Sequence, residues 1–163
     1  MTTRRCFVSV AAQSHEFSGR VFALLGAGMR VIALPLPRAP ADIAPMLDAA
    51  ARAQVQALRM WFLPVLSPAV WQQIGTWAIE HKVVTMGTLL SRGEAVICFG
   101  PELQEQARLH AEQIDRVLRG ARPAETPILQ PTRWEIVVNQ KLARAVGWPA
   151  PRAVLLQATE VIE

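Results

Sequence analysis

The chain has 163 residues, of which 52% are hydrophobic and 18% charged, and its mean hydropathy is +0.22. These values predict one soluble domain with its own core, and they exclude disordered, collagen-like and coiled-coil chains. The net charge is +4, but the basic residues are scattered among the acids, which disfavours nucleic-acid binding. No apolar run is long enough to predict a membrane span.

Short apolar runs alternate with longer amphipathic stretches in the first half of the chain. Strands are expected at residues 6–12, 29–37 and 55–63, because these runs are short and apolar. Helices are expected to begin after Ser14, Asp42 and Ser67, since each is a good N-cap residue that precedes apolar residues at helical spacing. The first of these helices should end at the glycines of residues 26–28.

The second half continues the alternation. Strands are expected at residues 83–88 and 95–99, and Pro101 then opens the longest helix, which ends at Gly120. The apolar face of this helix consists of Leu103, Ala107, Ala111, Ile114, Val117 and Leu118. Prolines keep residues 123–131 extended. A strand at 135–138, a short helix at 139–146 and an apolar segment at 154–162 complete the chain.

Strands and helices that alternate at this spacing predict right-handed crossovers and a mostly parallel sheet with helices on both faces. The expected architecture is therefore a three-layer α/β/α sandwich. We expect a single domain over 1–163, in which residues 1–122 form a βα lobe. Residues 123–163 add the proline-rich crossover, a strand and terminal helices.

Ligands of such sheets bind outside the carboxyl ends of the strands, in the loops that lead into helices. Four residues at these positions are candidate ligand contacts, namely Ser14, Ser67, Thr85 and Phe99. The hydroxyl groups would donate hydrogen bonds and Phe99 would form an apolar wall. For each of them, a purely structural role in a loop or the core is the alternative.

Residues suited to catalysis or metal binding do not cluster in the sequence. His15, His81 and His110 lie far apart, each within an expected helix, and Cys98 lies inside an expected strand. We therefore expect no catalytic residues, no metal site and no cofactor, and we expect Cys98 to be a buried, unreactive thiol.

The segment from Ile114 to Glu163 resembles the carboxyl-terminal part of a family of ABC-transporter substrate-binding proteins related to the tryptophan and tyrosine uptake receptors. The matching positions are Asp115, Arg116, Leu118, Gly120, Pro123, Ala124, Pro127, Pro131, Thr132, Glu135, Val138, Asn139, Ala143 and Gly147. The segment from Leu155 to Glu163 is similar to the end of that family as well. The resemblance implies one lobe, the carboxyl-terminal one, of a type I periplasmic-binding fold, in which two lobes enclose a small ligand.

What the resemblance implies is a solute-binding module without enzymatic activity, whose ligand is a small molecule such as an amino acid. The alternative is a structural or regulatory interaction protein derived from that lobe without ligand binding. The expected partners are a second copy of the chain or a separate first lobe, and an ABC-transporter permease. No nucleic-acid partner is expected.

The compartment has two alternatives. The family resemblance implies a periplasmic protein, and Arg4 and Arg5 before an apolar run are similar to a twin-arginine signal. The apolar run is short for a signal peptide and also fits the first strand, so a cytoplasmic protein is the alternative.

Overall fold

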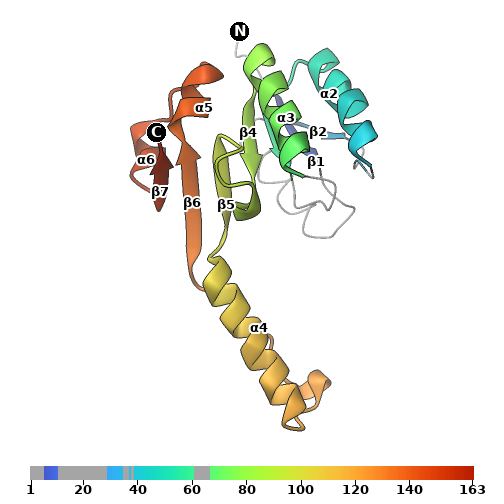
Figure 1. Cartoon of the computed structure of the whole chain (residues 1–163), viewed down its shortest axis with the longest axis vertical. Helices are drawn as coiled ribbons and strands as arrows, with labels where there is room; N and C mark the ends of the chain where they lie inside the picture. Colours follow the sequence, from blue (N-terminus) through green and yellow to red (C-terminus); the bar gives the residue numbers. More distant parts are fainter. Residues whose placement is uncertain (1–5, 11–28, 35–36, 38, 61–66) are drawn as a thin grey trace.

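The computed structural model describes residues 6–10, 29–34, 37, 39–60 and 67–163, with only the backbone described for residues 6–10. Within this part of the chain, seven strands form one sheet in the order β2-β1-β3-β4-β5-β6-β7 (Figure 1). The strands are β1 (Cys6–Val10), β2 (Arg30–Leu34), β3 (Ala57–Met60), β4 (Val84–Gly87), β5 (Ile97–Pro101), β6 (Trp134–Asn139) and β7 (Glu160–Ile162).

Parallel pairing dominates the sheet. Neighbouring strands among β2, β1, β3, β4 and β5 pair in parallel. Strand β6 runs antiparallel to β5, and β7 runs parallel to β6. This topology confirms the predicted α/β fold with a mostly parallel sheet. The predicted strands at 83–88, 95–99 and 135–138 are observed with ends shifted by one or two residues.

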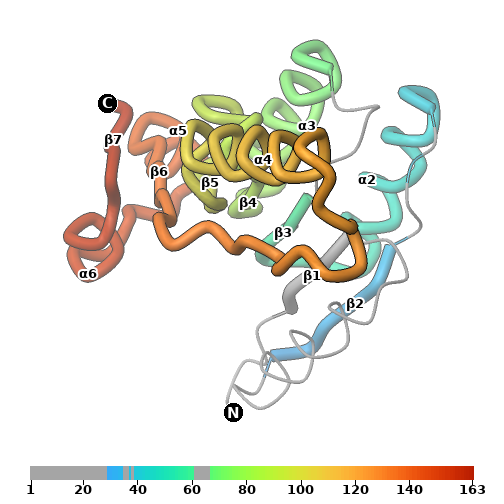
Figure 2. The backbone as a smooth tube through the Cα atoms, turned by 90° about the horizontal axis from the view of Figure 1, so that it is seen from below, coloured from blue at the N-terminus to red at the C-terminus, as the bar shows by residue number. Residues whose placement is uncertain are grey.

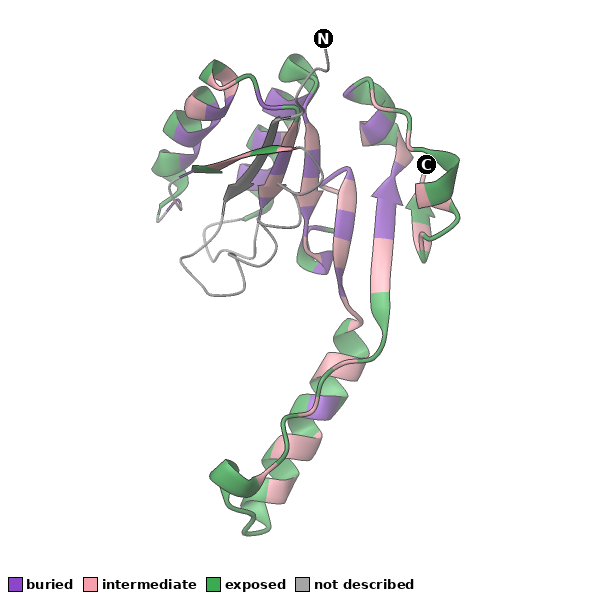
Figure 3. Cartoon of the chain, turned by 180° about the vertical axis from the view of Figure 1, so that it is seen from behind, coloured by how far each residue is buried: buried purple, intermediate pink, exposed green. Residues whose placement is uncertain are grey.

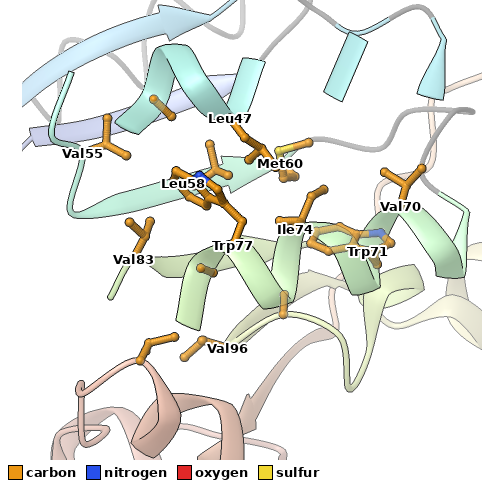
Figure 4. Packing of buried hydrophobic residues seen from close by; sticks show 14 of the residues in the cluster. Leu47, Val55, Leu58, Met60, Val70, Trp71, Ile74, Trp77, Val83 and Val96 are labelled. Carbon is orange, nitrogen blue, oxygen red and sulfur yellow. The ribbon is translucent and has the colours of Figure 1, made fainter. Parts of the chain in front are cut away.

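The helices α2 (Ile43–Arg52) and α3 (Pro68–His81) lie side by side over the sheet (Figure 1). Their apolar side chains meet those of β3 in one buried cluster, in which Leu47, Leu58, Ile74 and Trp77 are close neighbours (Figure 4). Burial of this apolar surface is the main force that holds the helices on the sheet. The helix expected after Ser14 lies outside the described residues.

Buried and half-buried residues alternate along β3, β4 and β5. Leu58, Thr85 and Cys98 belong to the buried set, which the strand register places on one face. Arg59, Met86 and Phe99 lie on the opposite face and are half-buried. The face away from α2 and α3 is therefore the less covered one.

The longest helix, α4 (Leu103–Leu118), projects away from the sheet (Figure 1). Residues 119–133 include the short 3₁₀ turn Pro123–Glu125 and run back beside α4 to β6 (Figures 2 and 3). Leu109 is the buried residue of α4. The apolar face expected for this helix is not buried, because Leu103, Ile114 and Leu118 are exposed.

Hydrogen bonds tie the returning segment to α4. The carboxylate of Glu105 accepts bonds from the Thr132 backbone N, the Thr132 Oγ1 and the Arg133 backbone N, at 3.0, 2.8 and 2.8 Å. Gln113 Nε2 donates to the Pro127 carbonyl oxygen at 2.6 Å. We call α4 together with residues 119–133 the arm.

The chain ends in two short helices and the last strand, with α5 (Gln140–Ala145) and α6 (Arg152–Leu155) on either side of the Gly147 turn. Asn139 caps α5, since its Oδ1 accepts a bond from the Leu142 backbone N at 2.9 Å, and its Nδ2 donates to the Gly93 carbonyl at 2.8 Å. One buried amide thus joins β6, α5 and the loop before β5.

Candidate functional site

A cavity of about 520 Å³ lies at the carboxyl ends of β3, β4 and β5. This volume is within the usual range of roughly 300–1,000 Å³ for small-molecule sites. The edge where parallel strands end is also where ligands bind in α/β sheets. The cavity is lined by Arg59, Met60, Met86, Gly87, Thr88, Leu89, Leu90, Phe99, Gly100, Pro101, Leu103, Gln106 and Trp134.

An aromatic pair forms one wall of the cavity. The rings of Phe99 and Trp134 are stacked, with centroids 5.1 Å apart and planes at 15°. The antiparallel register places them there, because Phe99 pairs with Ile136 and Trp134 pairs with Pro101, which makes the two rings diagonal neighbours. Such a stack contributes about 0.5–1.5 kcal/mol beyond the buried area. Trp134 is still 48% exposed.

Most of the remaining lining is apolar. Met60, Met86 and Leu89 come from β3, β4 and the 3₁₀ turn η2 (Leu89–Ser91). Methionine side chains adapt to ligands of different shape. Arg59 is the one charged side chain among the described lining residues, and Thr88 and Gln106 add polar groups. A guanidinium in an apolar pocket suits a ligand that combines an anionic group with an apolar body.

Two glycines let η2 lie close to the strands and shape the cavity wall. A Cβ atom on Gly87 would lie 2.1 Å from Ser91 Oγ, and one on Gly100 would lie 3.3 Å from Leu89 Cγ. Ser91 fixes η2 in this position, since its Oγ donates to the Thr88 carbonyl oxygen at 2.7 Å and its own carbonyl accepts a bond from Cys98 Sγ at 3.2 Å. The hydrogen bonds of Ser91 thus fix the position of the lining residues of η2.

The four residues predicted from the sequence do not come together. Phe99 lines the cavity. Thr85 is 2% exposed on the core face of β4, and its Oγ1 accepts a bond from the Val96 backbone N at 3.1 Å, which is a structural role. Ser67 is the N-cap of α3, where its Oγ accepts a bond from the Val70 backbone N at 3.4 Å. Ser14 lies outside the described residues.

Cys98 and His81 both have structural contacts. Cys98 is buried, and burial raises the pKa of its thiol, although a hydrogen bond with Ser91 opposes the change. A raised pKa disfavours the reactive thiolate. His81 stacks on Trp77 with ring centroids 4.7 Å apart, and its Nδ1 lies 2.9 Å from the Trp77 carbonyl oxygen.

No cluster of three or more His, Cys, Asp or Glu side chains suited to a metal ion occurs within the described residues. None of the described helices has both the length and the apolar composition needed to cross a bilayer.

No protein-family model and no curated protein matches this chain. Solved structures do match it. One is a conserved domain protein from Vibrio cholerae O1 biovar El Tor, with a TM-score of 0.78 and 16% identity over 97% of this chain and 54% of that one. A second is an ABC domain in complex with L-Trp from Streptococcus pneumoniae, with a TM-score of 0.73 and 18% identity over 98% of this chain and 55% of that one.

A third similar structure is the ligand-free, open form of a substrate-binding protein with adhesive properties from Clostridium difficile. It has a TM-score of 0.61 and 15% identity over 98% of this chain and 54% of that one. The chain thus spans about half the length of each matched protein. At these identities the likeness concerns the fold alone. This chain shares its α/β architecture with about half of the length of each of these three proteins.

Proposed function

We propose that the chain is a small-molecule-binding lobe of the substrate-binding type, without enzymatic activity, and that its ligand occupies the cavity beside Phe99 and Trp134. The observation that supports this function most directly is the position of the cavity. It is of ligand size, mostly apolar and located at the carboxyl ends of three parallel strands.

The lining favours an aromatic or branched amino acid as the ligand. The faces of Phe99 and Trp134 would contact its side chain, and the Arg59 guanidinium at the cavity wall would attract its carboxylate. Thr88 could donate a hydrogen bond to the same carboxylate. The Streptococcus pneumoniae neighbour was solved with L-Trp, which is consistent with this class of ligand.

The cavity is only half of a ligand clamp in this proposal. One lobe contacts the ligand from one side, and a second copy of the chain or a separate first lobe would cover the other side. Transport through an ABC permease, and a periplasmic location, belong to the same proposal. The cytoplasm is the alternative location.

A second candidate function is an interaction protein that has this fold and binds no small ligand. The observation that favours it is the exposed apolar surface of α4, where Ile114 and Leu118 are 60% and 81% exposed. Apolar surface of this kind is typical of protein contacts.

Isothermal titration calorimetry with the twenty amino acids distinguishes the two functions. We expect heat of binding from aromatic or branched amino acids, and loss of it in Trp134→Ala and Arg59→Gln. Leu156→Ala is the matched control, because Leu156 is 75% exposed and is not among the cavity-lining residues. If no amino acid binds the folded wild-type protein at millimolar concentration, the interaction protein is the better description.

A further inference from the structure

Much of α4 is exposed (Figure 3). One of its exposed faces carries mostly apolar side chains. The members of this face from Leu103 to Val117 are separated by four, three, four and three residues, which is the spacing that brings two helices together along a common seam. We call this surface the α4 face, and it consists of Leu103, Ala107, His110, Ile114, Val117 and Leu118.

Charged side chains are confined to the other side of the helix. Arg108 and Arg116 pair with Glu112 at 3.5 and 2.6 Å, and Arg119 pairs with Asp115 at 2.8 Å. The returning segment of the arm occupies the side that carries Glu105 and Gln113. None of the residues of the α4 face is an Asp, Glu, Lys or Arg, so no charged group would need to be desolvated when the face is covered.

We propose that a second copy of this chain covers the α4 face, with the two α4 helices antiparallel about a twofold axis near His110 and Ala111. In this arrangement Leu103 lies opposite Leu118 of the second copy. Ala107 lies opposite Ile114, so that a small side chain meets a large one. The face is thus complementary to itself, as a twofold interface requires.

The self-complementary pairing of Leu103 with Leu118 and of Ala107 with Ile114 supports this choice of occupant. A second copy presents the same face without Asp, Glu, Lys or Arg. The two copies can therefore pair without burying any of these charged groups.

The dimer would also alter the surroundings of the cavity. Leu103 belongs both to the α4 face and to the cavity lining. Its proposed neighbour, Leu118 of the second copy, would therefore lie beside the cavity mouth. Dimerisation itself does not depend on the proposed ligand, so a failure to dimerise and a failure to bind an amino acid are separate results.

The expected interaction is weak. Sixteen residues of helix provide a seam about 24 Å long. Two such helices bury less than the roughly 1,200 Å² of a standard interface, so we expect a dissociation constant in the micromolar range. The ion pairs of the other side leave the seam unaffected, so the affinity should depend little on salt.

Sedimentation equilibrium over about 1–200 µM protein tests the dimer and its surface together. We expect a monomer–dimer equilibrium in the wild type, and a dissociation constant at least about tenfold larger in Ile114→Glu, because the seam would bury an unpaired carboxylate. Leu156→Glu is the matched control, since it adds the same charge at an exposed leucine outside the arm, and we expect less than a twofold change.

Cysteine cross-linking tests the direction of the helices, in a Cys6→Ser background. Under mild oxidation, Ala107→Cys combined with Ile114→Cys should form a covalent dimer, whereas Ile114→Cys alone should not, because residue 114 meets itself only in a parallel pair. Circular dichroism of each variant establishes that it is folded, and Leu118→Glu at the helix end replaces any variant that is not. A wild-type monomer at every concentration overturns the proposal, as does a dimer that Ile114→Glu leaves unchanged.

Discussion

Replacement of Gly87 by alanine tests how closely η2 packs against the sheet. Gly87 is a buried residue of β4. A methyl group there would lie 2.1 Å from Ser91 Oγ and 3.1 Å from Trp71 Cη2. Neither neighbour can move freely, because Ser91 and Trp71 are both buried and the Ser91 hydroxyl donates to the Thr88 carbonyl oxygen.

The expected cost follows from these contacts. Overpacking of a buried site costs about 1–3 kcal/mol, and displacement of the Ser91 hydroxyl loses a hydrogen bond that contributes about 1 kcal/mol. Alanine also lowers the conformational entropy of the unfolded chain, which offsets about 0.4–1 kcal/mol of this cost. The free energy of unfolding should therefore fall by about 1–3.5 kcal/mol, which corresponds to a decrease in Tm of about 2–14 °C for a chain of this size.

Thermal unfolding by circular dichroism and urea titration measure this difference. Gly75→Ala is the matched control, because Gly75 lies inside α3 and a Cβ atom there meets nothing within 4 Å. We expect that control to stabilise the protein by up to about 1 kcal/mol. Adding Ser91→Ala to Gly87→Ala should restore part of the loss, since it removes the nearest atom. A Gly87→Ala protein as stable as the wild type would show that the close packing is not as described.

Three further predictions concern the thiol, the arm and the aromatic wall. In a Cys6→Ser background, Cys98 should react with iodoacetamide at pH 8 at least about 100-fold more slowly in the folded protein than after denaturation. The reason is that burial raises the pKa of the thiol and excludes the reagent. Equal rates would contradict this. Hydrogen bonds from Arg133 and Thr132 lower the pKa of Glu105 below its ordinary value of 4.5. The stabilisation by its carboxylate is therefore complete above pH 4.5 and is lost as the pH falls through the lower pKa of Glu105 in the folded protein. Glu105→Gln should flatten the dependence of Tm on pH in that window. An exposed control such as Glu163→Gln should not. Trp134→Ala should lower the free energy of unfolding by about 0.5–1.5 kcal/mol through loss of the stack with Phe99, and the near-ultraviolet circular dichroism should change with it.

Local sequence patterns were sufficient to predict most of the strands of the sheet. The apolar runs before Gly87 and around Cys98 predict strands because burial on both sides of a strand leaves a continuous apolar segment. Ser67 followed by Pro68 likewise marks the start of α3, where the side chain and the proline have the expected roles. Each of these signals lies within a few residues of sequence, so the element can be predicted without information about the rest of the chain.

The arm and the cavity depend on information that is not local. The helical spacing of Leu103, Ile114 and Val117 indicates a face that needs a cover, but the same spacing fits a sheet and a partner helix equally well. The choice between Thr85 and Met86 as a cavity residue depends on which side of β4 faces α3, and a one-residue change in register reverses it. Trp134 reaches the cavity only through the antiparallel pairing of β6 with β5.

The arm has a consequence for how the sheet is connected. β5 and β6 form a long-looped hairpin whose base is already closed, because the Glu102 backbone N donates to the Arg133 carbonyl oxygen at 3.0 Å and Glu105 binds Thr132 and Arg133. Loop-closure entropy changes by only about 0.6 kcal/mol for each doubling of loop length. The ladder between β5 and β6 would therefore tolerate a short turn in place of everything beyond that base, and the arm is an addition to the domain that its sheet does not need in order to close.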